Sequence, residues 1–184
     1  MAKRMRRDTP PQTFPPHLVW VLVGLTLGWG INWPIIKAVL FEMAPMHFRT
    51  LCLFFGAAGL FTIARISGLP IRIPKGQWPR TIAIAFFNMM GWNILAIYGV
   101  QLMASGRAAI LGYTMPVWSV IIATWLLKEP FTKRRALGCI LGGAGLLLLL
   151  GEEIQAVVRS PLGAILMVGA AVSWAIGTIM MKRW

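Results

Sequence analysis

Aromatic and amide side chains recur at helical spacing within otherwise apolar stretches of this chain. Four polar or aromatic residues in the first stretch would share one helix face, because their spacing follows the i, i+3, i+4 rule. They are Trp29, Asn32, Trp33 and Lys37. Pro34 lies among them and would remove one backbone hydrogen bond. Indole, amide and ammonium groups beside an opened backbone predict contact with a small polar or zwitterionic molecule.

Two further apolar stretches carry side chains of the same kinds. Asn88 and Trp92 are one helical turn apart, and Tyr113 comes shortly before Pro116 and Trp118. Polar groups are costly in the middle of a lipid bilayer, so where they occur they usually face a cavity or a partner. We therefore predict a pathway for a small solute between these stretches. Its predicted lining consists of Trp29, Asn32, Trp33, Lys37, Asn88, Trp92, Tyr113, Pro116 and Trp118.

Some of these residues also fit a structural role. A hydrogen bond between helices would explain the amides of Asn32 and Asn88 as well as contact with a solute would. Lys37 lies about one turn from the end of its apolar stretch, which favours a snorkelling anchor over contact with a solute. Pro34 and Pro116 favour the pathway, because a broken helix frees backbone carbonyls for a ligand.

The elements that would hold these residues are membrane helices. The chain is 58% hydrophobic and 12% charged, which leaves too little polar surface for a soluble globule of 184 residues. A membrane helix needs about 20 largely apolar residues. Six stretches meet that requirement, at residues 18–40, 48–68, 81–103, 107–127, 133–151 and 161–181. We therefore predict an all-α, polytopic membrane protein with six transmembrane helices.

Lysine and arginine are distributed unevenly between the two ends of the predicted helices. Fourteen fall on one side of the membrane, in the N-terminal tail, in alternate loops and after the last stretch, and four fall on the other. Cytoplasmic loops are enriched in these residues, so both termini are expected in the cytoplasm and the protein in the plasma (inner) membrane. Nucleic-acid-binding proteins gather such residues on one face of a soluble domain, so the net charge of +13 does not indicate a nucleic acid partner.

A segment near the start of the chain returns near its end. Residues 29–37 and 174–182 agree at three positions, with Trp first, Ile third and Lys last. The stretch at 161–181 is therefore interpreted as the opening of a second repeat. Its small residues Gly169, Ser173 and Gly177 line one face, which predicts close packing against a neighbouring helix. We expect the natural neighbours of that face to be missing from this chain.

Four motifs follow one another along the predicted helices. They are Trp29-Gly30-x-Asn32-Trp33-Pro34-x-x-Lys37, Phe48-Arg49-x-Leu51, Ala108-Ala109-Ile110-Leu111-x-Tyr113-Thr114-Met115-Pro116-Val117-Trp118 and Leu127-x-Glu129-x-x-Thr132-x-x-Arg135-x-x-Gly138. Together they resemble the EamA family of the drug/metabolite transporter superfamily. The resemblance covers all six predicted helices in order.

The resemblance implies a protein of ten helices, built from two five-helix repeats of opposite orientation, that exports amino acids, metabolites or drugs by alternating access. On this basis residues 1–17 are a basic, Pro-rich cytoplasmic tail and residues 18–151 are the first repeat. Residues 161–184 hold the first helix of an incomplete second EamA repeat. An odd number of helices per repeat inverts the second copy, as the charge distribution also requires. The implied partners are a small-molecule substrate and the lipid bilayer.

The sequence departs from the family pattern in two places. Cys52 stands where family members commonly have arginine, and helices 7 to 10 are absent. Both repeats enclose the substrate cavity of the family, so one wall of the cavity would be missing here. We therefore keep two alternatives to transport by the chain alone. One is a truncated fragment that does not transport, and the other is a half-transporter that needs a second copy of itself or the missing half.

Enzymatic function finds little support in the residues. An intramembrane protease needs a serine with a histidine on a membrane helix, or paired acids with metal-binding histidines. Neither His17 nor His47 lies within a predicted span, and Cys52 and Cys139 have no neighbours at metal-ligand spacing. We predict no catalytic residue, no metal site and no cofactor.

Overall fold

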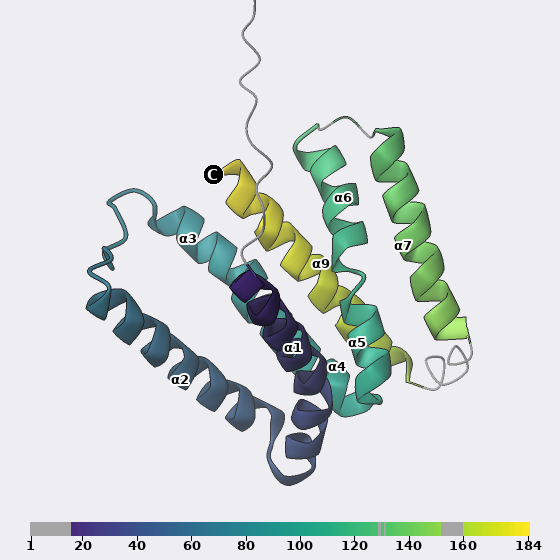
Figure 1. Ribbon diagram of the computed structural model, residues 1–184, viewed down its shortest axis with the longest axis horizontal. Coiled ribbons are helices and arrows are strands. Elements are labelled where there is room, and N and C mark those ends of the chain that lie inside the picture. The colour runs from purple at the N-terminus through teal and green to yellow at the C-terminus, as the bar shows by residue number, and fades with distance from the viewer. Residues whose placement is uncertain (1–15, 129, 131, 152–159) are drawn as a thin grey trace, which may run out of the picture. The chain divides into compact units, whose positions relative to one another are not determined.

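The computed structural model consists of helices and describes residues 16–128, 130, 132–151 and 160–184 (Figure 1). Four long helices are α1 (Pro16–Glu42), α2 (Pro45–Ile66), α7 (Lys133–Gly151) and α9 (Pro161–Arg183). Shorter helices follow one another in two stretches: α3 (Trp78–Ile84), the π-helix η1 (Ala85–Gly91) and α4 (Trp92–Leu102), then α5 (Ser105–Gly112) and α6 (Met115–Leu126). The described residues contain no strand. The predicted all-α fold is confirmed.

Five helical stretches of the described residues are long and apolar enough to cross a membrane. They are Leu18–Glu42, Pro45–Ile66, Trp78–Leu102, Ser105–Leu126 and Pro161–Arg183. The further helix α7 has 19 residues and lies where another span was predicted. At about 1.5 Å per residue it is about 28 Å long, close to the thickness of the hydrocarbon core of a bilayer. The chain is therefore a multi-pass helical membrane protein.

Prolines mark several helix starts. Pro45 and Pro161 begin α2 and α9, and Pro116 is the second residue of α6. A missing N–H costs little there, because the first N–H groups of a helix have no partner within it. Pro34 lies inside α1, which continues through it. Of the two prolines predicted to open a helix in the pathway, Pro116 therefore lies beside a break and Pro34 does not end its helix.

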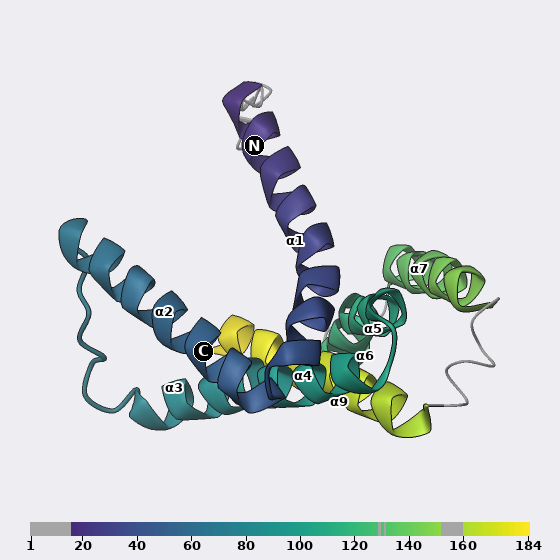
Figure 2. The same ribbon diagram turned by 90° about the horizontal axis from the view of Figure 1, so that it is seen from below.

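The chain divides into two compact units, Met1–Asn32 and Trp33–Trp184. In the first unit, residues 18–32 form the exposed first part of α1. In the second unit α9 is central, since it contacts α3, η1 and α4 as well as α5 and α6 (Figures 1 and 2). The helix α7 contacts α5 and α6, and α2 contacts α4.

The small residues of α9 pack against the stretch formed by η1 and α4. A Cβ atom added to Gly177 would lie 2.6 Å from the Cβ of Asn88 and 2.9 Å from its backbone nitrogen. A Cβ added to Gly163 would lie 3.1 Å from the Cβ of Leu102. These distances show that the small-residue face has a close partner within this chain. The physical reason is that η1 and α4 bring glycines of their own, Gly91 and Gly99, against α9.

Candidate functional site

Trp33 and Tyr113, both predicted to line the pathway, lie against each other in the second unit. Trp33 Nε1 donates a hydrogen bond of 3.2 Å to the Tyr113 hydroxyl, and the two rings meet edge to face with centroids 6.0 Å apart. Trp33 is 6% exposed, whereas Tyr113 is 45% exposed. A Cβ added to Gly112 would lie 3.1 Å from Cη2 of Trp33, so the glycine makes room for the indole. The pair leaves part of the phenol ring accessible.

The Tyr113 side chain extends from a break between two helices. The sequence predicts one helix over 107–127, but α5 ends at Gly112 and α6 begins at Met115. Thr114, within the break, donates a hydrogen bond to the carbonyl of Leu111 (2.6 Å) and accepts one from Trp118 Nε1 (3.1 Å). The indole N–H of Trp118 is therefore bonded within its own segment.

Lys37 connects two helices of the second unit. Its ammonium nitrogen donates hydrogen bonds to the carbonyls of Val100 (3.0 Å) and Gln101 (2.8 Å), near the end of α4. The last carbonyls of a helix lack partners within it and carry the negative end of its dipole, so a cation is well placed there. The predicted roles for Lys37 were a snorkelling anchor and a solute contact. The structure adds a contact that caps another helix.

Asn88 lies on η1 and contacts α9. Its Nδ2 donates to the carbonyl of Trp174 and to Oγ1 of Thr178, both at 3.4 Å. The hydroxyl of Ser173 donates a shorter bond of 2.7 Å to the carbonyl of Phe87. Asn88 was predicted either to bond to another helix or to contact a solute, and the structure shows the bond to another helix. A π-helix in a membrane span is uncommon, and such segments occur frequently at functional sites.

Trp92 also lies against α9. Its ring meets that of Trp174 edge to face, with centroids 5.5 Å apart. Trp174 was not among the predicted pathway residues, although it is the counterpart of Trp29 in the repeated segment. Trp29 and Asn32 themselves lie in the first unit, on the exposed part of α1.

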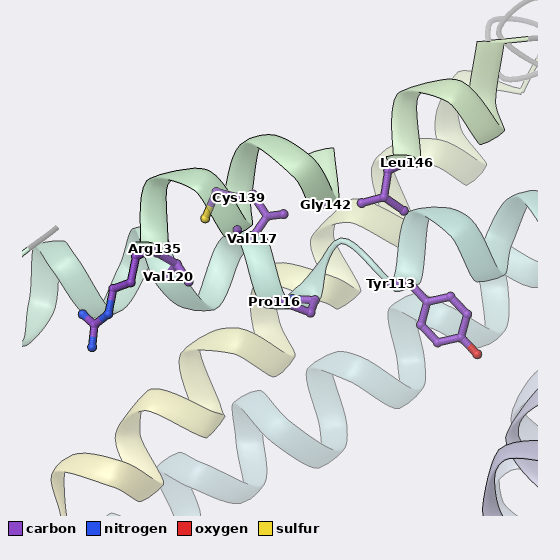
Figure 3. A pocket seen from close by; sticks show the side chains of 9 residues that line it. Tyr113, Pro116, Val117, Val120, Arg135, Cys139, Gly142 and Leu146 are labelled. Atoms are coloured by element: carbon purple, nitrogen blue, oxygen red, sulfur yellow. The ribbon is translucent and has the colours of Figure 1, made fainter. Parts of the chain in front are cut away.

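A cavity of about 390 Å³ lies between α7 and the segment that contains Tyr113 and α6 (Figure 3). Arg135 lies at one end of it and Tyr113 at the other (Figure 3). Its lining consists of Tyr113, Pro116, Val117, Val120, Arg135, Gly138, Cys139, Gly142 and Leu146. Tyr113 and Pro116 were predicted pathway residues, whereas the other seven were not. Only the position of α7 beside α6 brings those seven to one space, so no pattern in the sequence could have identified them as a set.

The structure thus brings together some of the nine predicted residues and separates others. Trp33 meets Tyr113, and Tyr113 shares the cavity with Pro116. Asn88 and Trp92 both contact α9 instead. The groups gathered in these places are indoles, amides, hydroxyls and an ammonium, which can hydrogen-bond to a ligand or stack on it. Within the described residues Glu42 is the only acidic side chain, and it lies at the end of α1.

Comparisons with known proteins agree with this description. The chain matches the EamA-like transporter family over residues 17–151. It is 31% identical over 162 residues to the uncharacterized transporter YoaV of Bacillus subtilis, covering 88% of this chain and 56% of that protein. It is 29% identical to the uncharacterized transporter YvbV of the same organism, covering 89% and 53% of the two chains. It is 26% identical to a probable amino-acid metabolite efflux pump of Escherichia coli, covering 84% and 50%.

The chain spans about half the length of these relatives. No solved structure matches it. The family match includes the Trp33–Tyr113 pair and most of the described helices. Since that match covers well over half of the sequence, the chain belongs to the EamA-like transporter family.

Proposed function

We propose that this chain contributes one side of a pathway through which a small organic solute, such as an amino acid, metabolite or drug, is exported by alternating access. The observation that carries the proposal is the contact between Trp33 and Tyr113. Polar aromatic side chains from α1 and from the α5–α6 break meet there, and the phenol ring stays partly exposed. Family membership and the name of the E. coli relative support export as the direction.

Irregular helices support alternating access as the mechanism. Transporters of several folds place their substrates at interrupted helices, whose freed backbone groups can bind a ligand. Here the break at Tyr113 and Thr114 lies on one span and the π-helix η1 on another. Both of these spans contact α9. A change in the position of α9 would therefore act on both irregular segments together.

Export is tested in E. coli cells that express the chain and are loaded with amino acids by uptake and hydrolysis of dipeptides. Each amino acid is supplied in turn, and its release into the medium is followed against cells with an empty vector. We expect faster release of at least one amino acid or of an added drug. Equal release in all arms, with the protein present in the membrane, would contradict transport by the chain alone.

Matched substitutions test whether the aromatic pair takes part. Tyr113→Phe removes the hydroxyl that accepts the Trp33 hydrogen bond, and we expect about fivefold slower release, equivalent to about 1 kcal/mol. The chain has two tyrosines, so Tyr98→Phe is the matched control and should leave release unchanged. Asn32→Leu should also slow release without lowering the amount of protein. Undiminished release in Tyr113→Phe and Asn32→Leu would remove both residues from the pathway.

The alternative of a half-transporter is proposed on one observation, the coverage of about half of each relative. Under this alternative the chain works with a second copy or with a separate second half. Light scattering in detergent distinguishes a monomer of 20.4 kDa from a dimer. Release that appears only when a second half is expressed with the chain would favour this alternative. A stable monomer that transports by itself would exclude it.

The proposed location is the plasma membrane, with both termini in the cytoplasm. The proposal rests on the excess of lysine and arginine on one side of the predicted spans. A fluorescent protein fused after Trp184 should fluoresce, and alkaline phosphatase fused at the same residue should be inactive. Active phosphatase at that position would overturn the orientation.

A further inference from the structure

The cavity between α6 and α7 combines a cation at one end with apolar walls along its length (Figure 3). We propose that it binds an anionic phospholipid, with the phosphate at Arg135 and one acyl chain along Gly138 and Gly142. This inference goes beyond export of a solute, since it assigns a second ligand to the cavity, which shares Tyr113 and Pro116 with the proposed solute pathway. The charged end of the cavity corresponds to the headgroup of such a lipid, and the apolar walls correspond to an acyl chain.

The charged end of the cavity suits a phosphate. Arg135 lies in the first turn of α7, directly after Lys133 and Arg134. Its Nη1 donates to the carbonyl of Pro130 at 3.4 Å, and its backbone nitrogen donates to Oγ1 of Thr132 at 3.4 Å. A guanidinium has five N–H donors in a planar fork, so one side chain can donate to the carbonyl of Pro130 and to a phosphate.

The position of Arg135 along the membrane suits a lipid headgroup. The charge distribution predicts that this end of α7 lies on the cytoplasmic side. Anionic lipids are concentrated in the cytoplasmic leaflet, and basic pockets between membrane helices on that side bind their headgroups. From Arg135 to Leu146 the helix rises about 16 Å, which is about half of the hydrocarbon thickness. The cavity therefore extends through about one leaflet.

The walls of the cavity suit an acyl chain. Val117, Val120 and Leu146 are aliphatic, and the two glycines expose only backbone. A Cβ added to Gly138 or Gly142 would meet nothing within 4 Å. The glycines therefore leave space between the helices instead of bringing them together. Between two helices in a bilayer, hydrocarbon is the surrounding medium that fills such an apolar space.

Native mass spectrometry of the full chain in detergent tests the charged end. The probes are palmitoyl-oleoyl phosphatidylglycerol, which is anionic, and the phosphatidylcholine with the same acyl chains, which is zwitterionic. We expect phosphatidylglycerol to bind about tenfold more tightly. Arg135→Gln should remove that preference, Arg135→Lys should keep most of it, and Arg134→Gln should change it less than twofold. Equal binding of the two lipids would contradict the proposed site. So would an equal loss of the preference for phosphatidylglycerol in Arg134→Gln and Arg135→Gln.

A pair of glycine substitutions tests the apolar part. Gly142→Leu fills the cavity, whereas Gly143→Leu changes the next residue of the same helix, which does not line it. A new Cβ at either position would meet no atom within 4 Å, so neither substitution is blocked at its first side-chain atom. We expect Gly142→Leu to weaken phosphatidylglycerol binding about tenfold and Gly143→Leu to leave it unchanged. No effect of Gly142→Leu would overturn the acyl-chain site.

Competition with octyl phosphate distinguishes a membrane lipid from a free amphipathic anion. It carries a phosphate on a single short chain. If a lipid is the ligand, octyl phosphate should compete only at concentrations at least tenfold higher than phosphatidylglycerol. Equal competition would show that the cavity takes soluble amphipathic anions and would overturn the lipid assignment.

Discussion

Glycines have opposite consequences in two regions of the second unit. Where α9 meets η1 and α4, a Cβ added to Gly177 would lie 2.6 Å from Asn88, and one added to Gly99 would lie 2.7 Å from Met167. Where α7 lies beside α6, a Cβ added to Gly138 or Gly142 would meet no atom within 4 Å. In the first region the glycines lie in close contact with the opposite helix. In the second region the glycines line a cavity.

The difference shows that a small-residue pattern alone does not specify close packing. Small residues permit two backbones to approach, but the approach also needs a partner with a complementary surface. The helix α9 meets Gly91 and Gly99 on its partner, together with an acceptor for the Ser173 hydroxyl. Along the cavity, α6 presents Val117 and Val120 toward α7. These side chains line the cavity and do not meet the glycines of α7 in a close contact.

The largest expected effect on stability comes from adding one methyl group where α9 lies in close contact with η1. In Gly177→Ala the new Cβ would overlap backbone atoms of Asn88, which cannot move without shifting η1. We expect a loss of about 3 kcal/mol in the free energy of unfolding. Titration with sodium dodecyl sulfate in mixed micelles, followed by circular dichroism, measures it. A loss below about 1 kcal/mol would contradict the close approach of α9 to η1.

A smaller loss of stability is expected at Gly99, because the side chain opposite it can move. In Gly99→Ala the new Cβ would overlap Cγ and Sδ of Met167, an adaptable side chain. We expect a loss of about 1.5 kcal/mol in the same titration. The double variant with Met167→Ala should lose less than the sum of the two single variants, because the second change removes the overlap. Strict additivity would show that Met167 is not the limiting contact.

Removing a hydrogen bond between α9 and η1 should lower the free energy of unfolding by a still smaller amount. Ser173→Ala leaves the carbonyl of Phe87 without the 2.7 Å bond from the serine hydroxyl. Hydrogen bonds between membrane helices contribute about 0.6 kcal/mol on average, so we expect a loss of about that size. Thr62→Ala is the control, since the Thr62 hydroxyl bonds to Ala58 within α2. A loss in Ser173→Ala that exceeds the one in Gly177→Ala would show that polar contacts hold this region more than backbone proximity does.

The smallest effect, and the one with the opposite sign, is expected beside the cavity. Gly142→Ala adds a methyl group where no atom lies within 4 Å and replaces the residue with the greater backbone entropy. We expect a gain of about 0.5 kcal/mol in the free energy of unfolding. A clear loss in this variant would show that α7 packs against α6 more closely than the cavity indicates.

The helical fold could be predicted because a lipid bilayer restricts the secondary structure of a segment that crosses it. Backbone groups inside a membrane must be bonded within the segment, so a long apolar stretch has to be a helix. The break beside Pro116 also has a local cause that the sequence displays. The π-helix over Ala85–Gly91 has no such signal, because its sequence contains no proline. Hydrogen bonds join it to residues of α9 that lie 86 positions away in sequence.

The candidate site could be predicted by residue type but not by pairing. Trp33 and Tyr113 were identified as polar aromatic groups in apolar stretches, and their contact joins residues 80 positions apart. Lys37 was predicted as a snorkelling anchor or a solute contact, and its bonds to the last carbonyls of α4 depend on how two helices cross. Trp174 was visible as the counterpart of Trp29, yet its contact with Trp92 was not.

The all-α membrane class, the long apolar helices and the family could be read from the amino-acid sequence, because they follow from composition, the length of the apolar stretches and local motifs. Which glycines lie in a close contact and which lie beside a cavity became clear only from the packing of the helices. The physical reason is that a glycine specifies only the absence of a side chain. What occupies the space beside it, the backbone of η1 at Gly177 or a cavity at Gly142, depends on the helix opposite.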